Sequence, residues 1–203
     1  MSEDAARLYL VTPELDAARD FAPLLTSALA AGDVASLLIR FALDDPRSRE
    51  AIVRTLAPIA QERGVAVLVD SDVSVALRAG ADGAHLHGAN DDLFAAVKKL
   101  SPRHIVGAGD LATRDDAMRA GEAGVDYVHL APKDPTQLID RVSWWSELFN
   151  TPCVARAETF ADVASLARAG ADFIMIDHVV WDDPRGPDVA VIEALNAIKG
   201  AQS

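Results

Sequence analysis

The pentapeptide Arg-Ala-Gly-Ala-Asp occurs at residues 78–82 and again at residues 168–172. Two weaker copies, AAGDV at 30–34 and GEAGVD at 121–126, complete a set of related glycines at Gly32, Gly80, Gly124 and Gly170. These glycines are 48, 44 and 46 residues apart, a regular step that indicates an internal repeat. The chain is therefore predicted to contain four copies of one structural unit.

Each repeat consists of an alanine-rich stretch, the glycine and a short apolar run. A glycine ends a helix at low cost because it can adopt the left-handed conformation. We therefore predict helices that end at the four glycines, over residues 27–31, 73–79, 115–123 and 162–169. We predict buried strands directly after them, over residues 35–39, 84–86, 127–130 and 173–176.

Four further apolar runs, at residues 8–12, 65–69, 104–107 and 153–155, alternate with these units. Eight near-continuously apolar strands, each followed by a helical pattern, are typical of a parallel sheet covered by helices. The pattern predicts a single (β/α)8 TIM barrel of the α/β class, one domain spanning residues 1–203. An open doubly wound sheet is the alternative, but it predicts neither eight strands nor the regular step. Residues 182–187 are expected to form a loop.

Composition restricts the class of protein further. Half of the residues are hydrophobic and a quarter are charged, as in a folded domain. The net charge of −12 argues against nucleic acid or an anionic membrane as partner. No apolar run approaches the ~20 residues of a membrane span, and residues 1–7 are polar and acidic, so we expect a cytoplasmic protein. The single cysteine, Cys153, excludes an internal disulfide and fits a reducing compartment.

The predicted barrel indicates where to look for a ligand site. Ligands of such barrels bind at the carboxyl ends of the strands. Despite the acidic total, three of these ends carry a cation, namely Arg40, Lys133 and Arg156, which suggests an anionic ligand. The alternative is that these cations pair with neighbouring Asp and Glu side chains in an ion-pair network.

Several polar residues near the strand ends can have a structural role, such as capping a helix, instead of binding a ligand. One of residues 70–72 is expected to cap the helix at 73–79. Capping-box spacing, with Asp in place of Glu, occurs at Thr113 with Asp116 and at Thr159 with Asp162.

The histidines and the cysteine divide by their places in the strands. His85 and His129 lie inside predicted strands and are expected to be buried and hydrogen bonded. Cys153 begins a strand and is expected to fill the core. His87 and His178 fall at strand ends, where they can contact a ligand.

Longer stretches resemble the thiamine phosphate synthase and TenI family from about Leu8 to Val179. The stretches are LYLVTP, LLIR, LVDSDVSVALRAGADGAHLHG, VGAGDLATRDDAMRAGEAGVDYVHLAP and ARAGADFIMIDHV. The most specific parts are ADG-x-HL at 81–86 and GVDY at 124–127. Synthase members of the family join a hydroxymethylpyrimidine diphosphate to a thiazole phosphate in thiamine biosynthesis, with Mg²⁺.

Carried onto this sequence, the resemblance implies a set of site residues. Arg40 and Lys133 would be catalytic, and Asp70, Asp72 and Asp92 would hold Mg²⁺. A phosphorylated heterocycle would be bound by Arg40, His87, Asp110, Lys133, Thr136, Arg156, Glu158, Asp177 and His178. A homo-oligomer is left open.

The sequence departs from the family pattern at the strand ends. The family's Gln-Leu-Arg-x-Lys reads Leu-Ile-Arg-Phe-Ala at 38–42, its Asn-Asp reads Asp-Ser at 70–71, and its Ile-Gly-Gly reads Arg-Ala-Glu at 156–158. Two alternatives therefore stay beside the synthase. One is a TenI-like thiazole tautomerase, whose histidine would fall on Pro132, with His129 nearby. The other is a catalytically inactive barrel that binds a ligand or acts as a regulator.

Overall fold

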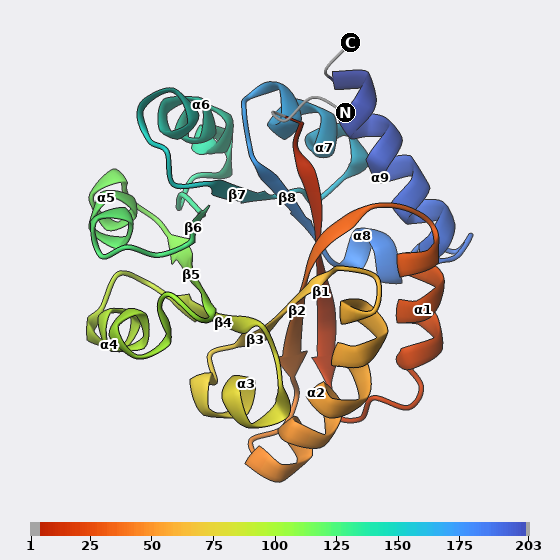
Figure 1. Cartoon of the computed structure of the whole chain (residues 1–203). Helices are drawn as coiled ribbons and strands as arrows, with labels where there is room; N and C mark the ends of the chain where they lie inside the picture. Colours follow the sequence, from red (N-terminus) through yellow and green to blue (C-terminus); the bar gives the residue numbers. More distant parts are fainter. Residues whose placement is uncertain (1–4, 202–203) are drawn as a thin grey trace.

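Eight parallel strands close into one barrel in the order β1 to β8, with the helices outside (Figure 1). The computed structural model describes residues 5–201; residues 1–4, part of the polar first segment, and residues 202–203 lie outside that range. The strands are β1 Arg7–Leu15, β2 Val34–Phe41, β3 Ala66–Asp70, β4 Gly83–His87, β5 Ile105–Leu111, β6 Tyr127–Leu130, β7 Cys153–Arg156 and β8 Phe173–Ile176. The predicted (β/α)8 barrel is confirmed.

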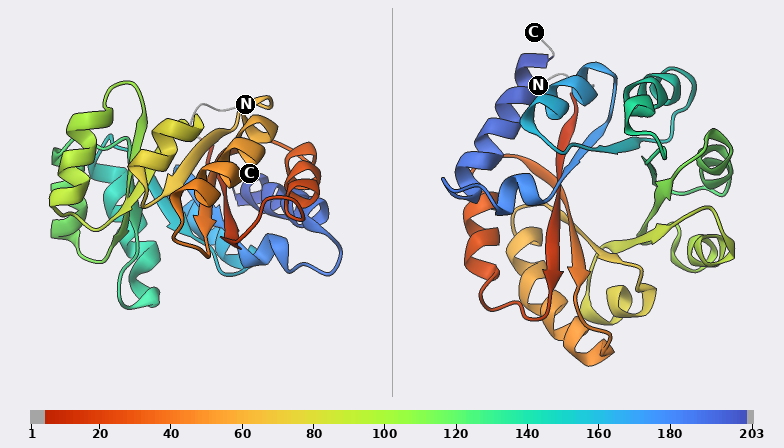
Figure 2. Two further views of the ribbon diagram at one scale, coloured as in Figure 1. Left: turned by 90° about the horizontal axis from the view of Figure 1, so that it is seen from below. Right: turned by 180° about the vertical axis from the view of Figure 1, so that it is seen from behind.

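The helices follow the strands in the expected alternation. They are α1 Ala22–Ala30, α2 Pro46–Gln61, α3 Val73–Ala79, α4 Asp91–Leu100, α5 Arg114–Glu122, η1 Pro135–Gln137, α6 Leu138–Leu148, α7 Phe160–Arg168, α8 His178–Trp181 and α9 Pro187–Ala201. The loop predicted after α8 ends one residue early, because Pro187 begins α9, a position that favours proline. Helix α9 packs beside α1 and α7 and so joins the two ends of the helical ring (Figure 2).

Three of the four repeat glycines are left-handed, as predicted. Their φ angles are +80° at Gly80, +86° at Gly124 and +94° at Gly170. The prediction is wrong at Gly32, which has no positive φ. There the glycine leaves room for the Leu195 side chain of α9, whose Cδ1 would lie 2.3 Å from an added Cβ and would have to shift.

The aspartate that ends the repeat has a role that the sequence pattern alone does not predict. In three copies its Oδ2 accepts a hydrogen bond at 2.7 Å from a backbone N–H in the first two residues of the preceding odd-numbered strand. The backbone N–H of the aspartate donates in return to the carbonyl of the strand residue whose N–H it accepts. The pairs are Asp82 with Val67, Asp126 with Val106, and Asp172 with Cys153. The repeated sequence therefore ties neighbouring strands together at the amino end of the barrel.

The barrel interior is filled by large side chains, several of them aromatic. Tyr9 and Tyr127 hydrogen bond through their hydroxyl groups at 2.9 Å, and Tyr127 OH lies 2.6 Å from Nδ1 of His85. In β5, glycine is required at two places, because a Cβ on Gly107 or Gly109 would lie about 2 Å from the Tyr127 or His85 ring. The interior is a packed core, which leaves the mouth at the carboxyl ends of the strands for a ligand.

The predictions for single residues in strands and caps are also confirmed. His85, His129 and Cys153 are buried. Burial raises the pKa of the Cys153 thiol to about 12, so it is not a reactive thiolate. The predicted caps form at Asp72, Thr113 and Thr159, each accepting an N–H from the first turn of its helix. Among residues 5–201, no helix combines the length and apolar character needed to cross a membrane.

Candidate functional site

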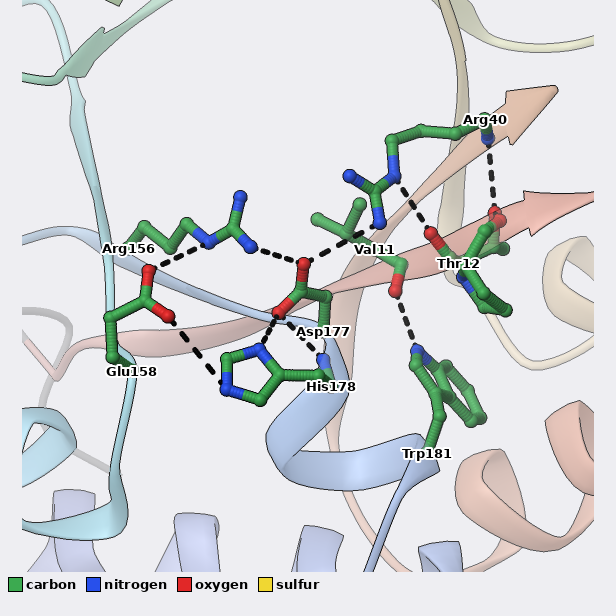
Figure 3. Close-up of polar contacts among 9 residues, drawn as sticks. Val11, Thr12, Arg40, Arg156, Glu158, Asp177, His178 and Trp181 are labelled. Atoms are coloured by element: carbon green, nitrogen blue, oxygen red, sulfur yellow. Dashed lines mark hydrogen bonds and ion pairs between the residues drawn. The ribbon is translucent and has the colours of Figure 1, made fainter. Parts of the chain in front are cut away.

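Two arginines meet on one carboxylate at the mouth of the barrel (Figure 3). Arg40 lies near the end of β2, Arg156 ends β7, and Asp177 follows β8. Nη2 of Arg40 lies 3.4 Å from Oδ2 of Asp177, and Nη2 of Arg156 donates to the same oxygen. We call Arg40, Arg156, Glu158, Asp177 and His178 the arginine cluster.

Arg40 is held in place by the neighbouring strand β1. Its backbone N–H donates to Oγ1 of Thr12 at 3.0 Å, and its Nε donates to the Thr12 carbonyl at 2.8 Å. Thr12 is fully buried, so both contacts are shielded from water. The Arg40 guanidinium is therefore already ordered in the free protein, so a ligand that binds it loses less side-chain conformational entropy.

Asp177 is the centre of the cluster. Burial alone raises its pKa, but the backbone N–H and the imidazole of His178, together with the charge of Arg156, outweigh burial and lower the pKa below its ordinary value. Its Oδ1 accepts from the His178 N–H at 2.6 Å and from the ring Nδ1 at 2.7 Å. Asp177 is therefore an ionised anchor for both arginines.

Glu158 contacts the cluster from its exposed side. Its Oε1 lies 3.1 Å from Nε of Arg156 and its Oε2 lies 3.7 Å from Nε2 of His178. Glu158 and Arg156 form an ion pair without a hydrogen bond, because the buried Nε of Arg156 has no acceptor in suitable geometry among the described residues. Glu158 is 61% exposed, so its attraction for Arg156 is weakened by solvent.

A second group of polar side chains lies on the opposite part of the rim. His87, which ends β4, places Nε2 2.7 Å from Oδ1 of Asp70 and Nδ1 2.8 Å from Oδ2 of Asp110. Asp70 ends β3 and Asp110 lies in β5, so three neighbouring strands contribute. We call Asp70, His87, Asp110 and His129 the histidine cluster.

The two histidines of this cluster differ in charge. Hydrogen bonds to Asp110 and Asp70 raise the pKa of His87 to about 10, so it is an imidazolium at neutral pH. The bond from His87 lowers the pKa of Asp110 to about 2. Burial lowers the pKa of His129 to about 4. His129 is therefore neutral, and its Nδ1 accepts the Asp110 N–H at 3.4 Å instead of forming an ion pair with the carboxylate 3.7 Å away.

Among the described residues, the remaining predicted side chains form no hydrogen bond or ion pair with either cluster. Lys133 is exposed after β6 and pairs with none of the described residues. Thr136 is exposed and donates to Asp134 within its own turn. Asp92 lies in the first turn of α4 and lines a groove of about 480 Å³, which Asp72 and His87 of the histidine cluster also line.

The carboxylates predicted to hold Mg²⁺ do not form a shared site. Both carboxylate oxygens of Asp72 already have partners: Oδ1 accepts from the Val75 N–H at 2.9 Å, and Oδ2 lies 3.3 Å from Nη1 of Arg49. Asp70 is bonded to His87. Within residues 5–201, no three His, Cys, Asp or Glu side chains are arranged to hold a metal ion. The residues present do not fit an octahedral Mg²⁺ centre.

The fold and the two clusters define a TIM-barrel protein with cationic groups held at its carboxyl mouth. The family model described as "Thiamine monophosphate synthase" matches residues 8–179. A thiamine-phosphate synthase of Rhodospirillum centenum is 37% identical over 207 residues, covering 96% of this chain and 98% of the relative. One of Hyphomonas neptunium is 34% identical over 206 residues, covering 95% and 93%. The chain belongs to the thiamine monophosphate synthase family.

A solved structure agrees with this at the level of the fold. Thiamine phosphate pyrophosphorylase from Pyrococcus furiosus superposes with a TM-score of 0.83 at 22% identity, and the alignment covers 98% of each chain. The resemblance read from the sequence is thus confirmed over the range it predicted.

The contact between His87 and two carboxylates was not predicted. The sequence shows His87, Asp70 and Asp110 at three strand ends, but it does not show that they touch. The pair Gly107 and Gly109 marks a different close approach, that of the Tyr127 and His85 rings, so it does not indicate this contact.

Proposed function

We propose that this chain binds a thiazole phosphate at the mouth of the barrel and joins it to a hydroxymethylpyrimidine diphosphate. The observation that carries the proposal is the convergence of Arg40 and Arg156 on Asp177. It is supported by the names of relatives that match almost the whole chain. We also propose that this chemistry takes place in the cytoplasm; a homo-oligomer stays a prediction.

The two guanidinium groups have donors to spare. Arg40 uses Nε and Nη2, while Arg156 uses Nη2 for its hydrogen bond to Asp177. A guanidinium carries five N–H donors, and its planar fork suits phosphate oxygens. We propose that the free Nη1 groups, with Nε of Arg156, hold the phosphate, and that Lys133 adds a third cation from the loop after β6.

A phosphate entering this site would meet Glu158. The carboxylate lies beside Arg156 without accepting a hydrogen bond from Nε, and it is largely exposed. We therefore propose that the phosphate displaces Glu158 and takes over Nε of Arg156, while the buried Asp177 stays in place. The site would exchange one weakly held anion for a ligand with more acceptor oxygens.

Mg²⁺, which the resemblance implies for the synthase reaction, is assigned no step. Asp70 and Asp72 are engaged elsewhere, and among the described residues they form no shared site with Asp92, as described above. The proposed roles are therefore limited to what the chain's own residues supply, which is positioning and neutralisation of the phosphate groups by Arg40 and Arg156.

The test is thiamine phosphate formation by the purified protein from the two substrates, measured by chromatography. We expect product with the wild type and at least a roughly tenfold loss in Arg156→Ala and Arg40→Ala, about 1.4 kcal/mol of transition-state stabilisation. Arg63→Ala is the control; Arg63 is exposed just after α2, and its side chain donates only to the Ile59 carbonyl among the described residues. No product from the wild type would refute the transferase, and calorimetry with thiazole phosphate would then show whether the barrel only binds.

A thiazole tautomerase is the second candidate, favoured by His129. This imidazole is buried, neutral and next to Asp110, and because its Nδ1 accepts the Asp110 N–H, its Nε2 carries the proton and can donate it to a substrate atom. A tautomerase predicts a change in the substrate's ultraviolet spectrum that is unaffected by EDTA and falls about 100-fold or more in His129→Gln. His104→Gln is the matched control, and an unchanged substrate spectrum with the wild type would exclude this candidate.

A further inference from the structure

His87 lies between two carboxylates that pair with no Lys or Arg side chain of residues 5–201. Its two ring nitrogens lie 2.7 Å from Asp70 and 2.8 Å from Asp110. Both distances are typical of charge-assisted hydrogen bonds. A ring that donates from both nitrogens carries one positive charge and satisfies one oxygen of each carboxylate.

The backbone around His87 is built to hold the ring there. The His87 carbonyl accepts from Nδ2 of Asn90 at 2.9 Å, and the N–H of Gly88 donates to Gly109 at 2.8 Å. The ring of His85 packs edge-on against that of His87, with centroids 5.3 Å apart. His87 is therefore held by hydrogen bonds of its local backbone and by the packed ring of His85.

The acidic partner on β5 is also held in an unusual conformation. Asp110 has a φ of +53°, in the left-handed region that few residues other than glycine adopt. Its N–H donates to His129, which fixes the direction in which the carboxylate leaves the strand. Backbone conformations of this kind persist only where the surrounding contacts maintain them.

We propose that the His87 side chain takes the place of a divalent cation at this rim, so that the folded protein binds Mg²⁺ or Mn²⁺ at neither Asp70 nor Asp110. The imidazole ring separates the two bonded oxygens, and one ion with Mg²⁺–oxygen distances of about 2.1 Å cannot contact both while the ring lies between them. The inference does not depend on which reaction the barrel carries out.

The position of the His87 ring between Asp70 and Asp110 also predicts the effect of removing the ring on cation binding. Without His87, two carboxylates face a shared space with no counter-ion, and oxygen ligands of this kind are what Mg²⁺ and Mn²⁺ bind. His87→Ala should therefore gain an affinity for divalent cations that the wild type lacks.

The test is thermal unfolding with and without MgCl2 or MnCl2, with NaCl at equal ionic strength as the reference, together with Mn²⁺ binding by electron paramagnetic resonance. We expect no saturable response of the wild type, and a saturable rise in Tm and Mn²⁺ binding in His87→Ala. His104→Ala, which removes a histidine far from both carboxylates, should behave as the wild type.

His87→Gln keeps a neutral donor and serves as a second variant if His87→Ala does not fold; it should bind Mn²⁺ more weakly than His87→Ala but measurably. Saturable binding by the wild type, or no gain in the folded His87 variant, would overturn the inference. Because no substrate is used, either result leaves the proposed transferase to its own test.

Discussion

Glu158 Oε1 lies 3.1 Å from the buried Nε of Arg156, yet it accepts no hydrogen bond from it. The carboxylate therefore neutralises the guanidinium without satisfying its donor. This is the expected geometry of a counter-ion that a ligand can displace, in contrast to the buried Asp177 beside it.

Glu158→Gln should bind inorganic phosphate more tightly than the wild type. Removing one negative charge near the bound anion is worth about 1 kcal/mol at 4 Å even in bulk water, or about fivefold in Kd. Calorimetric titration measures the change in Kd, and Glu147→Gln, which removes the same charge from an exposed position on α6, should leave it unchanged. Equal affinity of Glu158→Gln and wild type would show that phosphate does not bind beside Arg156.

The three repeat aspartates should contribute similarly to stability. In Asp82→Ala, Asp126→Ala or Asp172→Ala, the N–H at the start of a strand loses its acceptor, which costs about 1–3 kcal/mol of unfolding free energy. Urea unfolding measures the loss. Asp33→Ala is the internal control, because among the described residues the Asp33 side chain pairs only with the exposed Arg7 and its loss should cost under about 1 kcal/mol. Equal losses at Asp33 and Asp82 would contradict this role.

The hydrogen bonds of His87 should make stability depend on pH. Because the folded-state pKa is raised to about 10, the imidazolium contributes its full stabilisation below the unfolded pKa of about 6.5, and the contribution is lost as the pH rises through about 10. At the acidic end, Asp110 keeps its charge down to its pKa of about 2. The difference in urea stability between wild type and His87→Gln should thus be largest near pH 5 and vanish near pH 10.5. A stability difference between wild type and His87→Gln that grows with pH would show that His87 is not stabilised as an imidazolium in the folded protein.

Gly109 should not tolerate a side chain. An added Cβ would lie 2.2 Å from Nε2 of His85, so Gly109→Ala must displace a buried ring and should lower the unfolding free energy by about 1–3 kcal/mol. Gly200→Ala, in helix α9 with nothing within 4 Å of the added Cβ, should be neutral or stabilising. Equal stability of Gly109→Ala and wild type in urea would show that the His85 ring is free to move.

The sequence by itself determined the barrel and its local boundaries. Strands β6 and β8 and helix α3 begin and end where the apolar runs and the repeat glycine predict. The caps at Thr113 and Thr159 also follow from spacing alone, and the cap of α3 falls on Asp72, one of the three residues predicted for it. These features depend on neighbours within a few residues along the chain, and such neighbours can be read directly from the sequence.

Only the tertiary structure decided which polar side chains meet. The sequence places cations at three strand ends, but closure of the barrel joins Arg40 and Arg156 through Asp177 and leaves Lys133 exposed after β6. It likewise sets His87 between carboxylates from two other strands. Contacts between strands depend on register and on backbone conformations such as the positive φ of Asp110, and these are set by packing of the whole barrel rather than by any local pattern.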